Sequence, residues 1–256
     1  MNIQLRIAEQ YKGDKQLKEL IDNLPDSFSN AGEMLWNGRN KIKAIKIEGG
    51  KEAVVKKFKP LNLFQKFCYA ILRHKAKKAY LNGLELIKRG FPTPNPIAYV
   101  EIRNGRFIKD AYYICERNDM LPLEDQICCD NWNRDIVSAF AEFVARLHMN
   151  GIMHHDLNNT NVRYKVNDDK QYEFSLIDIN RMSFYVNAEE IPMKDRIENL
   201  TRFTGNIDLF DHFARVYAQA CGLNIETWME KAIKQKIRHD RNWVYRKRIL
   251  HPFRKR

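Results

Sequence analysis

The sequence predicts an α+β fold in two parts, with strands concentrated in residues 1–58 and helices dominating the C-terminal part. In residues 41–47 apolar and polar side chains largely alternate, and a second strand-like stretch, Ala-Val-Val-Lys-Lys-Phe at 53–58, follows the Gly49-Gly50 turn. Such alternation is typical of a half-buried strand, and two such stretches around a glycine turn predict a hairpin. A strand-rich half followed by a helical half is typical of α+β architecture.

The middle of the chain completes the strand-rich part. Residues 63–89 are predicted to be helical, and Gly90 suits the end of that stretch because three prolines follow closely and cannot continue it. Residues 97–102 and 107–115 are predicted strands joined by a turn.

The helical part begins with an amphipathic helix at 131–150. Its apolar residues recur every three or four positions, and Gly151 follows as a stop. A polar loop and a short apolar strand at 174–177 come next. Two further helices are predicted at 207–221 and from 225 to about 246.

The charge balance predicts an anionic partner. The chain has 44 Lys and Arg against 32 Asp and Glu, a formal net charge of +12, and a basic cluster at 246–256 holds part of the excess. An acidic membrane face, a phosphorylated substrate or nucleic acid would suit this charge. No nucleic-acid-binding motif accompanies it, so nucleic acid is not expected as a partner.

The cysteines and the hydropathy pattern predict a cytoplasmic protein. The five cysteines are odd in number and form no Cys-x-x-Cys pair, so neither a disulfide framework nor a zinc site is expected. No apolar run approaches the length of a membrane span, and the first residues lack the apolar core of a signal peptide.

The strongest chemical signal is a polar loop directly after the 131–150 helix. It places His154, Asp156 and Asn161 in the pattern H-x-D-x-x-x-x-N, and Asp178 ends the next apolar strand. Asp and Asn also favour loops for the sake of their own backbone hydrogen bonds. Here, however, the spacing, the preceding helix and the following strand all match the arrangement that supplies a base and metal ligands in protein kinases.

Phosphoryl transfer explains why these residue types are needed. A carboxylate must orient the acceptor hydroxyl and take its proton, and hard oxygen ligands must hold Mg²⁺ against the phosphates of ATP. We therefore predict Asp156 as the catalytic base and Asn161 and Asp178 as metal ligands, with ATP and Mg²⁺ as cofactors. His154 would brace the loop by bonding backbone near Asp178.

A cation for the phosphates is predicted in the N-terminal part. Residues 54–56, Val-Val-Lys, resemble the Val-Ala-Ile-Lys strand of kinases, in which the lysine reaches the α- and β-phosphates. Lys56 is therefore the candidate, and Lys57 should face the other side of the sheet. The turn at 37–40 has one glycine where the kinase phosphate loop has three. Gly38 and Arg39 are candidate phosphate-binding residues there, with a plain hairpin turn as the alternative.

Two glutamates complete the candidate nucleotide site. Glu85 is the only acidic residue in 63–89 and is the candidate to pair with Lys56, with a solvated surface position as the alternative. Glu116 follows the 107–115 strand where a hinge between two lobes would lie, and its backbone neighbours are candidates to bond adenine.

Three segments carry a narrower resemblance. They are residues 90–98 with the sequence Gly-Phe-Pro-Thr-Pro-Asn-Pro-Ile-Ala, the loop at 154–161, and residues 176–181 with the sequence Leu-Ile-Asp-Ile-Asn-Arg. Together they resemble the lipopolysaccharide kinase family, which includes Kdo kinases and inner-core heptose kinases. The resemblance runs from about Trp36 to Phe203.

The resemblance implies a two-lobed protein-kinase-like fold, which we divide into an N-lobe at 1–116 and a C-lobe at 117–256 of one catalytic unit. It also implies ATP-dependent phosphorylation of a Kdo or heptose hydroxyl on an anionic glycolipid, with peripheral contact at the inner face of the cytoplasmic membrane. Residues 178–180, Asp-Ile-Asn, stand where kinases have Asp-Phe-Gly. The missing glycine hinge favours a constitutive small-molecule kinase.

Other functions share the same catalytic loop. An aminoglycoside- or choline-kinase-like enzyme would act on a soluble substrate, but it gives the basic C-terminus no role. An atypical RIO-type Ser/Thr kinase is a further enzyme alternative. A pseudokinase binding module would explain the reduced glycine loop, but such proteins usually lose the base or a metal ligand, and this chain keeps all three.

Overall fold

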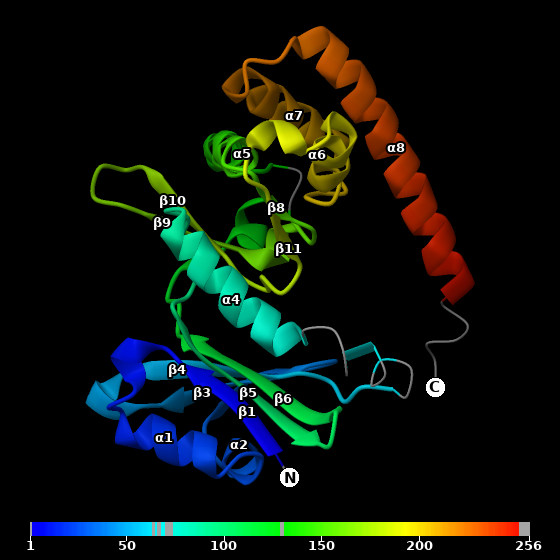
Figure 1. Ribbon diagram of the computed structural model, residues 1–256. Helices are drawn as coiled ribbons and strands as arrows, with labels where there is room; N and C mark the ends of the chain where they lie inside the picture. The colour runs from blue at the N-terminus through cyan, green and yellow to red at the C-terminus, as the bar shows by residue number, and fades with distance from the viewer. Residues whose placement is uncertain (1, 63–64, 66–67, 70–73, 129–130, 251–256) are drawn as a thin grey trace. The chain divides into compact units, whose positions relative to one another are not determined.

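The computed structural model describes residues 2–62, 65, 68–69, 74–128 and 131–250. It divides into two compact units (Figure 1). Unit 1 is formed by Met1–Asp119 with Asp178–Arg181, and unit 2 by Met120–Ile177 with Met182–Arg256. Each unit is considered separately below.

Unit 1 is built on a six-stranded antiparallel sheet with the order β1-β5-β6-β4-β3-β2. Its strands are β1 (Asn2–Ile7), β2 (Glu33–Asn37), β3 (Lys41–Lys46), β4 (Glu52–Lys57), β5 (Pro96–Asn104) and β6 (Phe107–Glu116). The two hairpins expected from the sequence are confirmed as the pairs β3–β4 and β5–β6. Alternating side chains in each strand therefore point to opposite faces of the sheet.

One face of this sheet is covered by two helices, α1 (Lys15–Asp22) and α2 (Asp26–Asn30) (Figure 1). Leu17, Leu20 and Ile21 of α1 join strand residues in one buried core. The expectation that residues 1–58 are β-rich overlooked both helices. The helical signal was local: Asp14 caps α1 by accepting from the Leu17 amide, and apolar residues follow at helical spacing.

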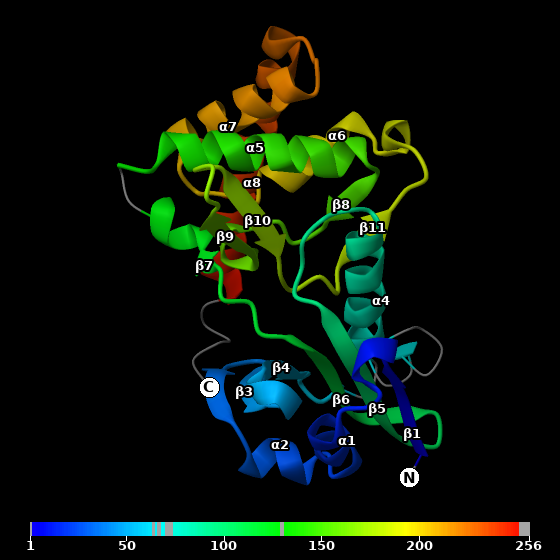
Figure 2. The ribbon, with the colours of Figure 1, turned by 90° about the vertical axis from the view of Figure 1, so that its left-hand side faces the viewer.

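The opposite face of the sheet carries α4 (Lys75–Lys88), which contacts β5 and β6 (Figure 2). Its buried stripe comprises Ala76, Ala79, Tyr80, Gly83 and Leu86. The helix ends where Gly90 takes a φ of +79°, a conformation that favours glycine, as the sequence predicted. Most of the N-terminal part of the predicted 63–89 helical stretch lies outside the described residues.

Unit 2 is mainly helical. Its helices are α5 (Arg134–Met149), α6 (Met193–Leu200), α7 (Ile207–Ala220) and α8 (Ile225–Leu250). Its strands form a three-stranded sheet and a two-stranded pair, from β7 (Leu121–Pro122), β8 (Ile152–His154), β9 (Val162–Val166), β10 (Tyr172–Leu176) and β11 (Met182–Phe184). Among the residues that the structure describes, the short 3-10 turns are η1 (Glu9–Tyr11), η2 (Glu48–Gly50), η3 (Leu123–Gln126), η4 (Asn159–Asn161) and η5 (Ala188–Glu190).

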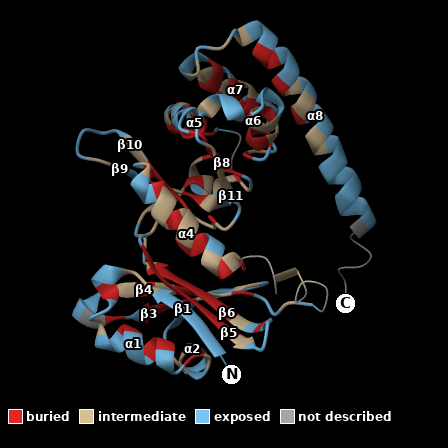
Figure 3. Cartoon of the chain, viewed as in Figure 1, coloured by how far each residue is buried: buried red, intermediate tan, exposed pale blue. Residues whose placement is uncertain are grey.

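Aromatic side chains fill the core of unit 2. Phe140 of α5 contacts Phe174, Phe203 and Phe213, and the ring centroids of Phe203 and Phe213 lie 4.5 Å apart. The first half of α8 joins this unit through buried residues, whereas its last turns are exposed (Figure 3). Within the described ranges, no helix combines the length and the apolar character that crossing a bilayer requires.

A buried histidine links three helices of unit 2. His148 of α5 bonds the hydroxyl of Tyr217 in α7 at 2.8 Å through Nδ1, and the amide oxygen of Asn199 in α6 at 3.2 Å through Nε2. Because Asn199 offers an oxygen, Nε2 carries the proton and Nδ1 accepts from Tyr217, which describes a neutral imidazole. Burial lowers the pKa of His148 from 6.5 to about 4.

This histidine predicts acid sensitivity. Between pH 6.5 and 4, His148 is protonated in the unfolded chain but stays neutral in the folded protein. The free energy of unfolding should therefore fall as pH falls through this window, by up to roughly 3 kcal/mol. Urea unfolding at several pH values should therefore give a shallower pH dependence for His148→Gln than for the wild type. Equal slopes for both proteins would contradict the assignment, whatever the variant's stability at neutral pH.

Candidate active site

In unit 1 a lysine and an aspartate form a close ion pair. Lys56 Nζ lies 2.5 Å from Asp178 Oδ1, and the two side chains are 14% and 33% exposed. Lys57, the next residue of β4, points to the other face and pairs with Asp110 at 3.0 Å. The predicted register is therefore present, with Lys56 and Lys57 on opposite sides of the sheet.

The segment that carries Asp178 is held by α4. The side-chain amide of Asn82 donates to the carbonyl of Ile179 at 2.7 Å. A Cβ placed on Gly83 would lie 2.5 Å from Pro96 and 3.1 Å from Ile179, so only glycine lets the helix approach this closely. Asp178 itself has a φ of +53°, an uncommon conformation for a residue other than glycine.

Glu85, the predicted partner of Lys56, is engaged elsewhere. Its carboxylate accepts from Arg89 Nε at 2.7 Å, one helical turn further along α4. The expected pairing with Lys56 is therefore wrong, and Asp178 provides the carboxylate for that lysine. The first turn of α4 contains no acidic residue that could replace Glu85.

The turn at 37–40 shows why Gly38 is a glycine. A Cβ on Gly38 would lie 2.4 Å from the indole nitrogen of Trp36, and the Gly38 amide donates to the Asn40 carbonyl at 3.3 Å. The Trp36 indole, which is 62% exposed, would have to move to make room for a side chain at this position. Arg39 is exposed at the tip of the same turn.

Glu116 is fixed by neighbours in unit 1. Its carboxylate accepts from the Tyr11 hydroxyl at 2.7 Å and from the Asn95 amide at 2.6 Å. Burial would raise the pKa of Glu116, but these hydrogen bonds lower it overall. The backbone amides of Glu116 and Arg117 donate to the carbonyls of Asn95 and Glu52, so adenine would have to use other groups at this strand end.

In unit 2 the polar loop is braced by His154. The imidazole Nε2 lies 3.1 Å from the carbonyl oxygen of Ile177 and therefore donates to it, while Nδ1 accepts from the Asp156 amide at 3.1 Å. The predicted contact between His154 and the backbone beside Asp178 is thus present. It fixes one tautomer of the ring and the backbone on both sides of the loop.

Asn161 is oriented within the same loop. Its side-chain nitrogen donates to the Asp156 carbonyl at 2.9 Å, and its backbone carbonyl accepts from the Ile177 amide at 2.9 Å. Because the side-chain nitrogen of Asn161 bonds the Asp156 carbonyl, the side-chain oxygen of Asn161 points away from that carbonyl. The carboxylate of Asp156 itself accepts from the side chain of Asn158 at 3.4 Å.

A buried chain of side chains supports the loop, and sequence reasoning missed it. Asn199 donates to the His154 carbonyl at 2.7 Å while its oxygen accepts from His148. The signal available in the sequence was the position of His148, four residues after Val144 on the apolar face of its helix. Since all these groups are buried and bonded, they fix the loop rather than react.

The donor set fits magnesium better than a softer metal. Asp178 offers a carboxylate and Asn161 an amide oxygen, and Mg²⁺ is usually bound by one or two such ligands together with substrate phosphates and water. Among the described residues no group of three or more His, Cys, Asp or Glu could by itself enclose a metal ion. Each of these two residues, taken by itself, supplies the hard oxygen that a metal arriving with a nucleotide would need.

Comparison with known proteins places the chain in a family. The model of the family described as "Lipopolysaccharide kinase (Kdo/WaaP) family" matches residues 75–213, which is more than half of the chain. The chain belongs to this family. The matched range contains the polar loop and Asp178. No curated protein matches the chain.

One solved structure shows the same fold, and two others are more distant matches. The structure titled "WaaP in complex with acyl carrier protein" matches with a TM-score of 0.56 at 18% identity and covers 91% of this chain and 99% of that one. Two structures of the Rio2 kinase from Chaetomium thermophilum also match. One has a TM-score of 0.45 at 18% identity and covers 82% of this chain and 70% of that one. The other has a TM-score of 0.48 at 17% identity and covers 88% of this chain and 78% of that one. The chain is therefore a phosphotransferase of the lipopolysaccharide kinase family with a protein-kinase-like α+β fold.

The support of Asp178 by α4 can be tested directly. Asn82→Ala removes the hydrogen bond to Ile179, and we expect it to weaken Mg²⁺-dependent nucleotide binding by up to about tenfold, as one lost hydrogen bond allows. Calorimetry with Mg·ATP measures this loss.

Glu85→Gln is the matched control, because it disrupts an ion pair of the same helix that does not reach Asp178. Its affinity should stay within about twofold of the wild type, since an ion pair of this kind contributes little. If Glu85→Gln weakens binding more than Asn82→Ala does, Glu85 contributes to the nucleotide site after all, and Asp178 is not the only carboxylate that matters to Lys56.

Proposed function

We propose that this protein is an ATP-dependent kinase that transfers the γ-phosphoryl group to a sugar hydroxyl of the lipopolysaccharide inner core, on Kdo or heptose. The observation that carries the proposal is the Lys56–Asp178 ion pair, because it joins a cation suited to phosphates and a carboxylate suited to Mg²⁺ in one unit. Family membership supports the acceptor class.

The proposed reaction assigns each residue one task. The acceptor oxygen forms a bond to the γ-phosphorus, the bond from that phosphorus to the bridging oxygen breaks, and ADP leaves with the electron pair. Asp156 orients the acceptor hydroxyl and takes its proton. Lys56 places a positive charge on the α- and β-phosphates.

Asp178 and Asn161 would hold Mg²⁺, which when bound supplies charge stabilisation at the phosphate oxygens. Residues Ile177 and Asp178 are consecutive, so the metal-binding carboxylate directly follows the strand end whose carbonyl His154 bonds. His154 and Asn199 act as positioning residues, since they touch only backbone and buried side chains.

The competing functions differ in what they require. A pseudokinase would bind nucleotide without transfer, whereas His154, Asp156 and Asn161 are all retained in a hydrogen-bonded loop. A kinase of a soluble acceptor would need no membrane contact. The exposed end of α8, which carries Arg246, Lys247 and Arg248, favours an acceptor anchored in an anionic membrane.

Asp156→Asn tests the proposed chemistry. Loss of the base should lower the rate of phosphate transfer from ATP to deep-rough lipopolysaccharide by roughly 10²–10⁴, while nucleotide affinity stays near the wild-type value. The assay follows labelled phosphate into the lipid fraction. A rate close to the wild type would exclude Asp156 as the base, and a wild-type protein that binds ATP but transfers no phosphate would favour the pseudokinase.

The last turns of α8 combine basic and apolar side chains. Trp243, Tyr245 and Ile249 are exposed, and Arg246, Lys247 and Arg248 lie among them. Residues 251–256 of the predicted basic cluster lie outside the described residues. We propose that this end of α8 contacts the anionic face of the cytoplasmic membrane, where each basic residue contributes about 1 kcal/mol.

Charge substitutions in α8 test the membrane contact. Arg246→Gln with Arg248→Gln should weaken binding to anionic phosphatidylglycerol vesicles roughly tenfold or more, and the wild-type affinity should fall as salt rises. Lys231→Gln with Lys234→Gln changes the same charge at exposed positions earlier in the helix and is the control. Equal losses in both variants would mean that total charge, rather than this end of α8, determines the binding.

A further inference from the structure

Lys75 lies in an electrostatic field that is mainly positive. Burial lowers the pKa of Lys75 first, the charges of Arg39, Arg181 and Lys56 lower it further, and Asp178 raises it. The net effect of these charges disfavours the positive charge of Lys75. Such an excess of positive charge at a partly buried position favours an anionic ligand.

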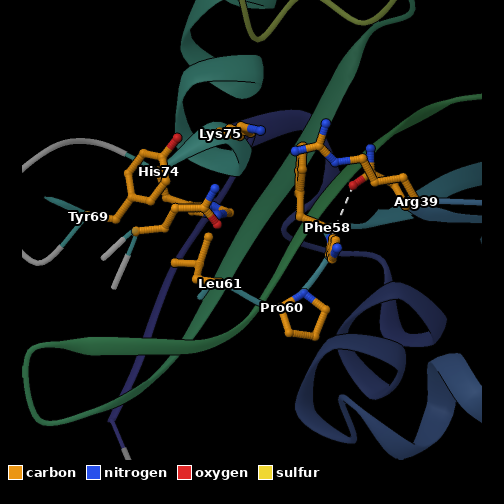
Figure 4. Close-up of a pocket in the computed structure, with 10 residues that line it drawn as sticks. Arg39, Phe58, Pro60, Leu61, Tyr69, His74 and Lys75 are labelled. Atoms are coloured by element: carbon orange, nitrogen blue, oxygen red, sulfur yellow. Dashed lines mark hydrogen bonds between the residues drawn. The ribbon is translucent and has the colours of Figure 1, made fainter. Parts of the chain in front are cut away.

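Two of these cations line one small hollow. Arg39, from the turn between β2 and β3, and Lys75, the first residue of α4, lie on its wall, and their charged ends point toward one another across Phe58 in Figure 4. No acidic side chain occurs among the described residues that line it: Arg39, Asn40, Phe58, Lys59, Pro60, Leu61, Gln65, Tyr69, His74 and Lys75. Like charges directed at the same space repel unless an anion lies between them.

The hollow lies beside the Lys56–Asp178 pair. Lys56 Nζ is 5.4 Å from the centre of the Phe58 ring. The same ring also contacts the imidazole of His74, and the centroids of these two rings are 5.5 Å apart. His74 accepts from the Ala76 amide at 3.2 Å, and its burial lowers its pKa to about 4, so the imidazole adds no charge. The charges that face the hollow are therefore those of Arg39, Lys59 and Lys75.

The size of the hollow limits what can enter it. Its volume is about 20 Å³, which is room for one water-sized group and far less than a base or sugar ring needs. A phosphoryl oxygen meets both requirements, because it is small and negatively charged. The beginning of α4 adds amide groups and a positive helix-dipole end to the same place.

We propose that Lys75 and Arg39 bind a terminal phosphate of the nucleotide and replace the reduced glycine loop in this role. The proposal rests on the function proposed above and adds Lys75 as a phosphate-binding residue on α4. From the sequence, the only residue of this helix predicted to belong to the nucleotide site was Glu85, as the partner of Lys56. Phosphate chemistry could also come from a phosphate carried by the acceptor. The nucleotide is favoured because Lys56 and Asp178, which serve its phosphates and metal, share the same electrostatic field.

The test uses Lys75→Ala with Lys78→Ala as its matched control. Lys78 lies one turn further along α4 and is exposed, so the two variants change the same charge on the same helix. The probes are tripolyphosphate, ATP, adenosine and a monosaccharide phosphate, measured by calorimetry and by the shift in melting temperature. Lys75→Arg keeps the charge and should restore most of the binding.

We expect Lys75→Ala to lose about tenfold to a hundredfold in affinity for tripolyphosphate and ATP, as the loss of a charged hydrogen bond implies. Lys78→Ala should stay within about twofold, as is usual for an exposed charge, and adenosine affinity should not change. Equal effects of the two alanine variants on tripolyphosphate, or no tripolyphosphate binding by the wild type, would overturn the proposal.

The outcomes separate this site from the proposed function. Tripolyphosphate binding that depends on Lys75, in a protein that transfers no phosphate from ATP, supports the anion site and refutes the kinase. Normal transfer in Lys75→Ala with unchanged ATP affinity refutes the anion site alone. Dependence on Lys75 for the monosaccharide phosphate but not for tripolyphosphate refutes the nucleotide as the source of the phosphate.

Discussion

The ion pair between Lys56 and Asp178 is the interaction on which the chemistry of unit 1 depends. It joins the sheet to the short segment 178–181 at a distance of 2.5 Å. The position of the ammonium group follows from the register of β4, since a slip of one residue would present Lys57 instead. The position of the carboxylate follows from α4, through the side chain of Asn82 and the missing side chain of Gly83. The strand β4 and the helix α4 therefore determine the positions of both charged groups.

Unit 2 arranges its catalytic loop by a different means. Here backbone groups are bonded by buried neutral side chains, with His148 and Asn199 behind His154. Buried, fully bonded polar groups of this kind are costly to disturb, so they define one loop conformation. Because burial lowers the pKa of His148 to about 4, this histidine stays neutral around pH 7. The loop of unit 2 is thus held by hydrogen bonds, whereas Lys56 and Asp178 of unit 1 are held together by an ion pair.

Much of this arrangement was predictable from sequence, because it depends on local spacing. The H-x-D-x-x-x-x-N loop, the β3–β4 hairpin and the opposite faces of Lys56 and Lys57 all follow from periodicity and motif. What depends on contacts between distant residues was not predictable. Glu85 is an acidic residue on the expected helix, but it pairs with Arg89, and that i,i+4 spacing is visible in the sequence. The contact between Lys56 and Asp178, 122 residues apart, is not visible there.

The role proposed for Lys75 was not predictable from the sequence for a related reason. A lysine at the start of a helix is normally solvated, and only the fold brings Arg39 and Lys56 near it. The glycine of the 37–40 turn is a weaker signal than its motif position indicates, because the exposed Trp36 side chain lies where a Cβ would be. The motif therefore identified the residues predicted as base and metal ligands, whereas the cations near Asp178 became visible only through the packing of β2, β4 and α4.

The most direct test of the ion pair is a double-mutant cycle on nucleotide binding, with ATP affinity measured with and without Mg²⁺ in Lys56→Met, Asp178→Asn and the combined variant. Lys57→Met serves as the control on the opposite face of β4. We predict that Asp178→Asn removes the gain in affinity that Mg²⁺ brings, that Lys56→Met weakens binding in both conditions, and that the two effects are not additive. A Mg²⁺-dependent gain that survives Asp178→Asn, or a larger loss in Lys57→Met than in Lys56→Met, would contradict the assignment of this pair as the nucleotide site.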